Sequence, residues 1–202
     1  GSLLGGVPMS GMQRWASPVP PYAVSARGAQ ITDADGQVYL DFALGDTAAM
    51  AGHAPAALVR AMAAQLENGA TTMLPSEAAI DAAEELTRRF GLPLWQLCLT
   101  ATDANRFVLR IARAVTKRPK VLVHNWCYHG TVDETFAIAA PGGSAGAAQA
   151  RPGNTGPQVD PSITTRVVEI NDLTATEAAL AAGDVAAILI EPALTNIGIV
   201  LP

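Results

Sequence analysis

The sequence predicts an α/β protein with a mostly parallel sheet, helices on both faces of that sheet, an N-terminal arm and a small antiparallel hairpin. Strand patterns alternate with helix patterns after residue 54, which is typical of right-handed βαβ units. Residues 185–191, VAAILIE, are apolar on both faces, as a central parallel strand requires. Asp35 and Gly36 interrupt short alternating runs, and this pair indicates a tight turn between two strands.

The predicted boundary between the two regions lies after residue 53. Residues 1–53 hold the arm, which is rich in Gly, Pro and Met, and a hairpin or meander that ends near Phe42. Residues 54–202 hold the α/β layer, in which residues 140–162 are predicted to form a flexible insert rich in Gly, Ala, Pro and Ser. The predicted helices cover residues 55–68, 76–90 and 103–116, with a short one after a Thr174–Glu177 capping box. The predicted strands cover residues 95–100, 120–124, 164–170 and 185–191.

Composition limits the classes of function that the chain can serve. Half of the 202 residues are hydrophobic, which is enough for a substantial buried core. The formal net charge is −5 and basic residues cluster only at residues 116–120, so nucleic acid and anionic membranes are not expected partners. No apolar run has the length of a membrane span. Cys98 and Cys127 form no CxxC pair, and two isolated cysteines are typical of a cytoplasmic protein.

Polar or unusual residues follow three of the predicted strands, at the points where ligands bind in open α/β sheets. The three strand ends are CLTATDAN (98–105), VHNWCYHG (123–130) and LIEPALTN (189–196). At the first, Thr102 and Asp103 open a helix. They either cap this helix or leave its N-terminal N–H groups free for an anion such as phosphate, and the sequence leaves both possibilities open.

The second strand end is followed by four possible metal ligands, His124, Cys127, His129 and Asp133. Their spacing matches no common zinc pattern, and packing against the sheet is the alternative for the first two. Tyr128 suggests a different use, because a phenol ring at a strand end can lie flat against a planar ligand. Gly130 would let the backbone turn there without a side chain in the way.

The third strand end carries a carboxylate, Glu191, directly after the most apolar strand, and Asn196 follows it. A buried charge without a partner is costly, so Glu191 needs either a ligand or an ion pair. The candidate partners for an ion pair lie on one face of the helix at 103–116: Arg106, Arg110 and Arg113.

Taken together, these segments resemble the N-terminal half of a class III, fold-type I aminotransferase that uses pyridoxal phosphate (PLP). They are most similar to the glutamate-1-semialdehyde aminomutase-like branch of that family. The segments that carry the resemblance are GGVPM, DADGQVYLDF, AGHAP, TATDANRFVLRIARAVTKRPKVLVHNWCYHG and IEPALTNIGIVLP. The resemblance implies PLP as the cofactor and the large domain of that fold in incomplete form. It also implies a homodimer, and transfer of an amino group between an amino acid or amine and an oxo acid or aldehyde.

The resemblance further implies seven cofactor-binding residues: Ala101, Thr102, Asp103, Tyr128, His129, Glu191 and Asn196. Thr102 and the Ala101 backbone would bind the phosphate. Tyr128 would stack on the pyridine ring with His129 beside it. Asn196 would reach the phenolic oxygen of the ring, and Glu191 would help to hold that wall of the site.

Four positions depart from the family pattern. Ala101 replaces the usual Gly and Asp103 replaces the usual Glu, and both changes keep the helix N-terminus open to phosphate. Met9 and Asp46 stand where the aminomutase branch has a Ser and a Trp that contact the substrate. These two candidate substrate contacts favour an ordinary aminotransferase over an aminomutase.

The resemblance places two groups essential to PLP chemistry beyond the EP…N segment: the Schiff-base lysine and the carboxylate on the pyridinium nitrogen. Lys117 and Lys120 are predicted to lie on the far side of the sheet, so neither can replace that lysine. No catalytic residue is therefore expected within the 202 residues, and this chain alone is expected to be inactive. A non-catalytic binding module made of this half alone is the remaining alternative.

Overall fold

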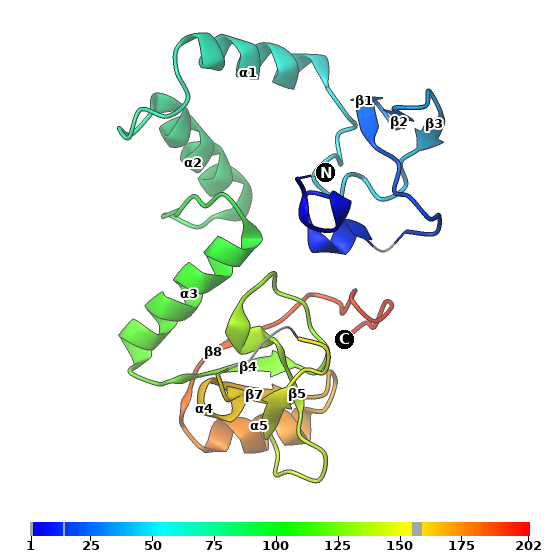
Figure 1. The fold of residues 1–202 in the computed structure, drawn as a ribbon. Helices are drawn as coiled ribbons and strands as arrows, with labels where there is room; N and C mark the ends of the chain where they lie inside the picture. The colour runs from blue at the N-terminus through cyan, green and yellow to red at the C-terminus, as the bar shows by residue number, and fades with distance from the viewer. Residues whose placement is uncertain (1, 14, 155–158) are drawn as a thin grey trace. The chain divides into compact units, whose positions relative to one another are not determined.

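The computed structural model describes residues 2–13, 15–154 and 159–202. The chain divides into two compact units, Gly1–Asp81 and Ala82–Pro202, so the division lies within helix α2 (Glu77–Phe90) (Figure 1). The predicted boundary after residue 53, between the arm with its hairpin and the PLP-binding layer, stays a prediction. None of the described helices is long and apolar enough to cross a membrane.

The first unit contains an antiparallel sheet of three strands. These are β1 (Ala23–Arg27), β2 (Gln30–Asp33) and β3 (Val38–Leu40), in the order β1-β2-β3. The turn between β2 and β3 is closed by the Asp33 carboxylate, which accepts hydrogen bonds from the N–H groups of Asp35 (3.0 Å) and Gln37 (2.8 Å). Gly36 adopts a left-handed φ of +81° in this turn. The predicted meander is confirmed.

Three further elements belong to the first unit or extend from it. Two short 3-10 turns, η1 (Leu4–Gly6) and η2 (Ser10–Gln13), lie in the segment predicted as an irregular arm. Helix α1 (Ala56–Glu67) follows Pro55, whose fixed φ and missing N–H suit a helix start. Both α1 and α2 therefore form where the sequence predicts them.

The second unit is built around a parallel sheet in the order β7-β4-β8. Its strands are β4 (Lys120–His124), β7 (Thr165–Val168) and β8 (Val185–Leu189). Its helices are the C-terminal part of α2 with α3 (Ala101–Thr116), the short α4 (Pro161–Thr164) and α5 (Leu173–Ala181). Parallel pairing of β4 with both neighbours confirms the predicted α/β fold class.

Successive residues of β4 point to opposite faces of this sheet. Val121 and Val123 pack in one buried cluster with Leu109 of α3, whereas Leu122 packs in a second cluster with Ala179 of α5. Helices therefore cover both faces of β4, which is the central strand. The prediction that residues 185–191 form the central strand is wrong: β8 is an edge strand of the described sheet, and Ile188 is 48% exposed there.

The predicted strand at residues 95–100 is wrong. These residues have no regular secondary structure, and Leu99 is 99% exposed. A strand persists only where a neighbour pairs its N–H and C=O groups, and the described sheet ends at β7 and β8. Apolar residues with high strand propensity are not enough without that neighbour.

The predicted capping box at Thr174–Glu177 is also wrong. Helix α5 begins at Leu173, two residues before the start that the box implies, and Asp172 is its N-cap: the carboxylate accepts a hydrogen bond from the N–H of Ala175 at 2.8 Å. Asp is as good an N-cap as Ser or Thr. The helix itself lies where it is predicted.

The segment predicted as a flexible insert, residues 140–162, contains regular structure in its described part. β6 (Ala148–Ala150) pairs antiparallel with β5 (Ala137–Ala139), and Gly146 forms a bridge to Val167 of β7. This β5–β6 hairpin therefore lies against the edge of the parallel sheet. Residues 155–158 lie outside the described residues, and flexibility of the segment stays a prediction.

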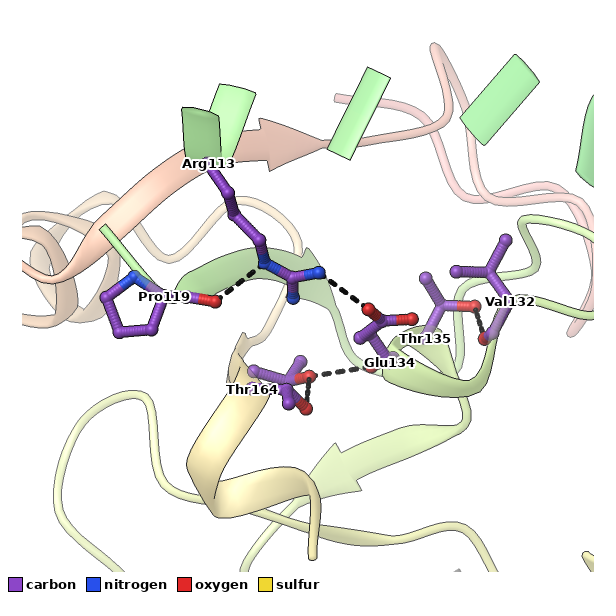
Figure 2. A network of polar contacts seen from close by, with 7 residues as sticks. Arg113, Pro119, Val132, Glu134, Thr135 and Thr164 are labelled. Carbon is purple, nitrogen blue, oxygen red and sulfur yellow. Dashed lines mark hydrogen bonds and ion pairs between the residues drawn. The ribbon is translucent and has the colours of Figure 1, made fainter. Parts of the chain in front are cut away.

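A polar network joins the C-terminal part of α3 to the sheet (Figure 2). Arg113 donates hydrogen bonds to the carbonyl of Pro119 (2.8 Å) and to the carboxylate of Glu134 (2.7 Å). Thr165 of β7 donates to the Glu134 carbonyl at 2.7 Å. Burial is the largest single effect and would raise the pKa of Glu134. The bond from Arg113, a backbone hydrogen bond and the charges of Arg113 and Arg106 together outweigh it and hold the pKa below its usual value.

Candidate functional site

The N-terminus of α3 is capped by Thr100. Its hydroxyl oxygen accepts a hydrogen bond from the N–H of Asp103 at 3.1 Å, and the hydroxyl donates to the Asp103 carboxylate at 2.8 Å. The reading in which Thr102 or Asp103 is the cap is therefore wrong. The N–H groups of Ala101 and Thr102, at the first two helical positions, have no intrahelical partner, because helix geometry leaves them unpaired.

The first turn of α3 is bound directly to the loop after β4. The hydroxyl oxygen of Thr102 accepts the N–H of Thr131 at 3.0 Å, and the Asn105 amide donates to the His129 carbonyl at 3.1 Å. Gly130 lies between them with a φ of +74°, and a Cβ on it would come within 3.2 Å of the Thr102 Cα. Glycine is required here by both its backbone conformation and this close approach.

Glu191 connects the loops after β4 and β8. One carboxylate oxygen accepts the N–H of Tyr128 at 2.9 Å. The other accepts the N–H of Thr195 at 3.2 Å and the Thr195 hydroxyl at 3.0 Å. The predicted ion pair between Glu191 and an arginine of α3 is therefore wrong. Arg113 is instead paired with Glu134.

Asn196 lies in a short loop closed by two backbone hydrogen bonds between Leu194 and Val200, of 2.9 and 3.0 Å. Leu194 is buried in the core, which anchors the loop, while Asn196 is exposed. Tyr128 is 53% exposed, so much of its ring is accessible. The second unit therefore brings Thr102, Tyr128 and the Asn196 loop to linked segments beyond the carboxyl ends of the strands.

His129 is almost fully buried at 7% exposure, and Cys127 is completely buried. Burial lowers the pKa of His129 and His124, and raises the pKa of the Cys127 thiol to about 11. These side chains are therefore neutral at pH 7. Within residues 2–13, 15–154 and 159–202, no group of three or more His, Cys, Asp or Glu could hold a metal ion.

Met9 and Asp46 belong to the first unit. Met9 is exposed, and Asp46 lies in a loop where it adopts a left-handed φ of 57°. The Asp41 carboxylate closes this loop, because it accepts hydrogen bonds from the His53 ring (2.7 Å) and from the N–H of Gly45 (2.9 Å). The bond from His53 is the main cause that holds the pKa of Asp41 below its usual value. A substrate contact at Met9 or Asp46 stays a prediction.

The two lysines after α3 lie at the opposite ends of the strands from Tyr128. Lys117 is the left-handed C-cap of α3, and Lys120 at the start of β4 pairs with Asp184 at 3.3 Å. This placement agrees with the prediction that neither lysine reaches the strand-end loops. Asp184 also accepts hydrogen bonds from two guanidinium nitrogens of Arg166, at 2.7 and 2.9 Å.

Two cavities in the described part of the second unit are lined by none of the seven predicted cofactor-binding residues. One, of about 410 Å³, lies beside β6 and α4, and Arg151 lines it. The other, of about 280 Å³, lies between α3 and the 3-10 turn η3 (Asp133–Thr135).

Sequence reasoning missed two residues that organise the strand-end loops. Thr195 shares the Glu191 carboxylate, and its position directly before Asn196 is the only signal in the sequence. Arg151 donates a hydrogen bond to the carbonyl of Cys127 at 2.5 Å. It is the single basic residue within 140–162, which is the pattern that could have drawn attention to it.

Comparison with known proteins identifies the family. The class-III aminotransferase family matches residues 12–202. A glutamate-1-semialdehyde 2,1-aminomutase of Cenarchaeum symbiosum is 34% identical over 190 residues, which is 94% of this chain and 44% of that protein. The chain thus spans less than half the length of such relatives.

Solved structures give the same result. A glutamate-1-semialdehyde-aminomutase of Pseudomonas aeruginosa is 50% identical, with a TM-score of 0.93 over 100% of this chain and 44% of that one. A variant of that enzyme has been solved in complex with PMP. An omega-transaminase of Sphaerobacter thermophilus is 34% identical, with a TM-score of 0.83 over 98% of this chain and 46% of that one. The family match, the relatives and the shared fold agree, and this chain belongs to the class-III aminotransferase family.

Proposed function

We propose that the full-length protein containing this chain is a PLP-dependent enzyme that moves an amino group, and that this chain supplies one part of its cofactor site. The observation that carries the proposal is the linkage of three strand-end segments. Thr102 binds the loop after β4, and Glu191 binds both that loop and Thr195. Ligands bind at such strand ends in open α/β sheets.

The groups present fit the two ends of PLP. The N-terminus of α3 offers the N–H groups of Ala101 and Thr102, and the Thr102 hydroxyl accepts from Thr131 and so can donate its own proton. These donors and the helix dipole suit a phosphate. The exposed ring of Tyr128 suits a flat heterocycle. A relative with 50% identity binds PMP, which supports the same assignment.

When bound, PLP would supply an electron sink for reactions at the carbon that carries the amino group. The residues of this chain would bind and orient that group. Thr102 would hold the phosphate, Tyr128 would support the ring, and Asn196 would lie within reach of the ring's polar edge. Glu191 would fix the positions of the last two.

Two reactions compete for this site. The aminomutase reaction keeps the amino group on one substrate, and the names of the most similar relatives favour it. The aminotransferase reaction uses a separate donor and acceptor. Met9 and Asp46 favour the aminotransferase reaction, because the aminomutase branch has Ser and Trp at those positions. The similarity to an omega-transaminase also favours the aminotransferase reaction. The relatives outweigh the two positions, so the aminomutase is the first candidate.

The cofactor is tested by titrating PLP into the cofactor-free full-length protein and recording visible absorption and circular dichroism. We expect saturable binding that Thr102→Ala and Tyr128→Ala weaken by about tenfold each, since each removes a direct contact. The exposed Thr174 on α5 provides a control, and Thr174→Ala should bind PLP like the unaltered protein. Absence of any PLP signal in the unaltered protein would refute the proposed function.

The reaction is tested by supplying substrates singly and in pairs. An aminomutase converts glutamate-1-semialdehyde alone, with no second substrate. An aminotransferase requires an amino donor and an oxo-acid or aldehyde acceptor together for repeated turnover. Turnover only with pairs would exclude the mutase, and turnover of the single substrate would exclude the transferase.

We also propose that the full-length protein is a homodimer, as the resemblance to the family implies. Light scattering coupled to size-exclusion chromatography gives its mass in solution directly. A mass of two chains supports the dimer, and a mass of one chain contradicts it.

A further inference from the structure

The loop after β4 begins with a strained turn. The N–H of Cys127 donates to the His124 carbonyl at 3.2 Å, which closes a four-residue turn directly after the strand. Trp126 occupies the third position of this turn with a φ of 60°. That left-handed conformation favours Gly or Asn, and a bulky side chain adopts it only where neighbouring groups hold it there.

Arg151 holds this turn from the β5–β6 hairpin. Its guanidinium donates to the carbonyl of Cys127 at 2.5 Å, and its central carbon lies 5.7 Å from the centre of the Trp126 ring. A guanidinium at that distance from an indole ring is attracted to it. One side chain therefore contacts both the strained Trp126 and the peptide group that joins Cys127 to Tyr128.

The backbone of Arg151 is itself fixed. Its N–H donates to the carbonyl of Phe136 at 2.9 Å, directly beyond the pairing of β5 with β6. The arginine thus projects from a hairpin bonded to the sheet edge, and a fixed backbone makes its guanidinium a defined anchor rather than a mobile surface group.

The residue after the held turn is Tyr128. Its N–H binds Glu191, so the peptide joining Cys127 to Tyr128 is held on both sides: Arg151 binds its carbonyl, and Glu191 accepts its N–H. This peptide and the strained Trp126, two residues before Tyr128, set the direction in which the tyrosine side chain leaves the backbone.

We propose that Arg151 is a positioning residue: it holds the left-handed Trp126 and the Cys127 peptide, and so places the Tyr128 ring for the cofactor. The role of the ring rests on the proposed function. The holding of the turn does not, because it depends only on contacts within this chain. The β5–β6 hairpin thereby supports the site through Arg151.

The first experiment uses the cofactor-free full-length protein and follows hydrogen exchange in peptides covering residues 126–131. Arg151→Gln removes the charge and the fork of donors. We expect exchange of this loop to accelerate by about tenfold, while α5 keeps its protection. The matched control is Arg118→Gln, because Arg118 also donates to a backbone carbonyl, that of Val185 at 3.2 Å, at the other end of the strands. Unchanged exchange in Arg151→Gln, or equal acceleration in both variants, would overturn the proposal.

The second experiment measures coupling through PLP affinity. Trp126→Gly removes the strain, since glycine adopts a φ of 60° freely. Arg151→Gln should weaken PLP binding about tenfold in the unaltered background and less than threefold in the Trp126→Gly background. Arg151→Lys, which keeps the charge, should restore part of the affinity and the visible circular dichroism. Purely additive effects would contradict the proposal.

The two experiments separate the two proposals. If the unaltered protein binds no PLP, the proposed function fails, and the exchange experiment still decides whether Arg151 holds the turn. If PLP binds and exchange in the 126–131 loop is insensitive to Arg151→Gln, the positioning role fails and the proposed function stands.

Discussion

The carboxylate of Glu191 accepts the backbone N–H of Tyr128 at 2.9 Å, although 63 residues separate the two in sequence. The same carboxylate binds Thr195 through both its N–H and its hydroxyl. One side chain at the end of β8 therefore fixes the loop that carries Tyr128 and the loop that carries Asn196.

Replacement of Glu191 should destabilise these two loops. In Glu191→Gln one acceptor oxygen becomes an amide donor, which leaves an N–H group or hydroxyl of the two loops without its partner. We expect a loss of about 1–3 kcal/mol in the free energy of unfolding of the full-length protein, measured with urea. Glu177→Gln, at an exposed position on α5, is the control and should change stability by less than about 0.5 kcal/mol. Equal effects of the two replacements would contradict the bridging role.

Gly130→Ala tests the close approach of the loop to α3. Gly130 and Gly91 have similar left-handed φ values, +74° and +71°, but a Cβ on Gly91 would meet nothing within 4 Å. Gly91→Ala therefore measures backbone strain alone, about 1 kcal/mol. Gly130→Ala adds the contact with Thr102 and should cost about 1–3 kcal/mol more, in line with overpacked sites. Chemical denaturation of both variants gives the difference, and a difference near zero would show that the loop moves freely away from α3.

The half-buried His124 and the buried His129 predict a loss of stability in mild acid. Burial lowers the pKa of His124 and His129 below the ordinary value of 6.5. As pH falls below about 6.5, the unfolded chain binds protons that the folded chain does not, so the free energy of unfolding decreases until the folded-state pKa values are passed. Urea midpoints between pH 7.5 and 5.5 should therefore decrease with pH.

A matched variant attributes that slope to its cause. His129→Gln removes one titrating group, and the slope of stability against pH should become shallower between pH 6.5 and 5.5 if His129 contributes as predicted. A slope unchanged by this replacement would assign the effect to other groups. A rise in stability on acidification would contradict the burial of both rings.

Arg113 should be intolerant of lysine. Its guanidinium binds Glu134 and the Pro119 carbonyl at the same time, with two nitrogens in a fixed fork (Figure 2). Lysine carries a single donor centre and cannot keep both bonds in that geometry. Arg113→Lys should therefore cost about 1–3 kcal/mol in unfolding free energy. Arg110→Lys, at an exposed position on the same helix, is the comparison and should be nearly neutral.

Most of the secondary structure could be predicted because it is determined locally. Pro55 precedes α1, the Asp35–Gly36 pair turns the meander, and the apolar run at residues 185–189 forms strand β8. Residues 95–100 show the limit of local reasoning. Their composition suits a strand, but a strand also requires a partner, and no local pattern reports whether that partner is there.

The strand-end segments could be found from the sequence, but the contacts that join them could not. The three strand ends could be found because ligands gather there in parallel sheets. The partner of Glu191 could not be predicted. Both an arginine side chain of α3 and a backbone N–H can donate to a carboxylate, and the sequence does not show which of them lies near it. Arg151 was missed for the same reason: its contacts with Trp126 and Cys127 arise from the β5–β6 hairpin, which the Gly- and Ala-rich sequence conceals.

A crystal structure of the full-length protein grown with PLP tests the central claim most directly. The structure predicts density for a phosphate group within hydrogen-bond distance of the Thr102 hydroxyl and for an aromatic ring against Tyr128. The Asn196 loop should border the same ring. Cofactor density at another place on the protein, with Thr102 and Tyr128 both facing solvent, would contradict the assignment.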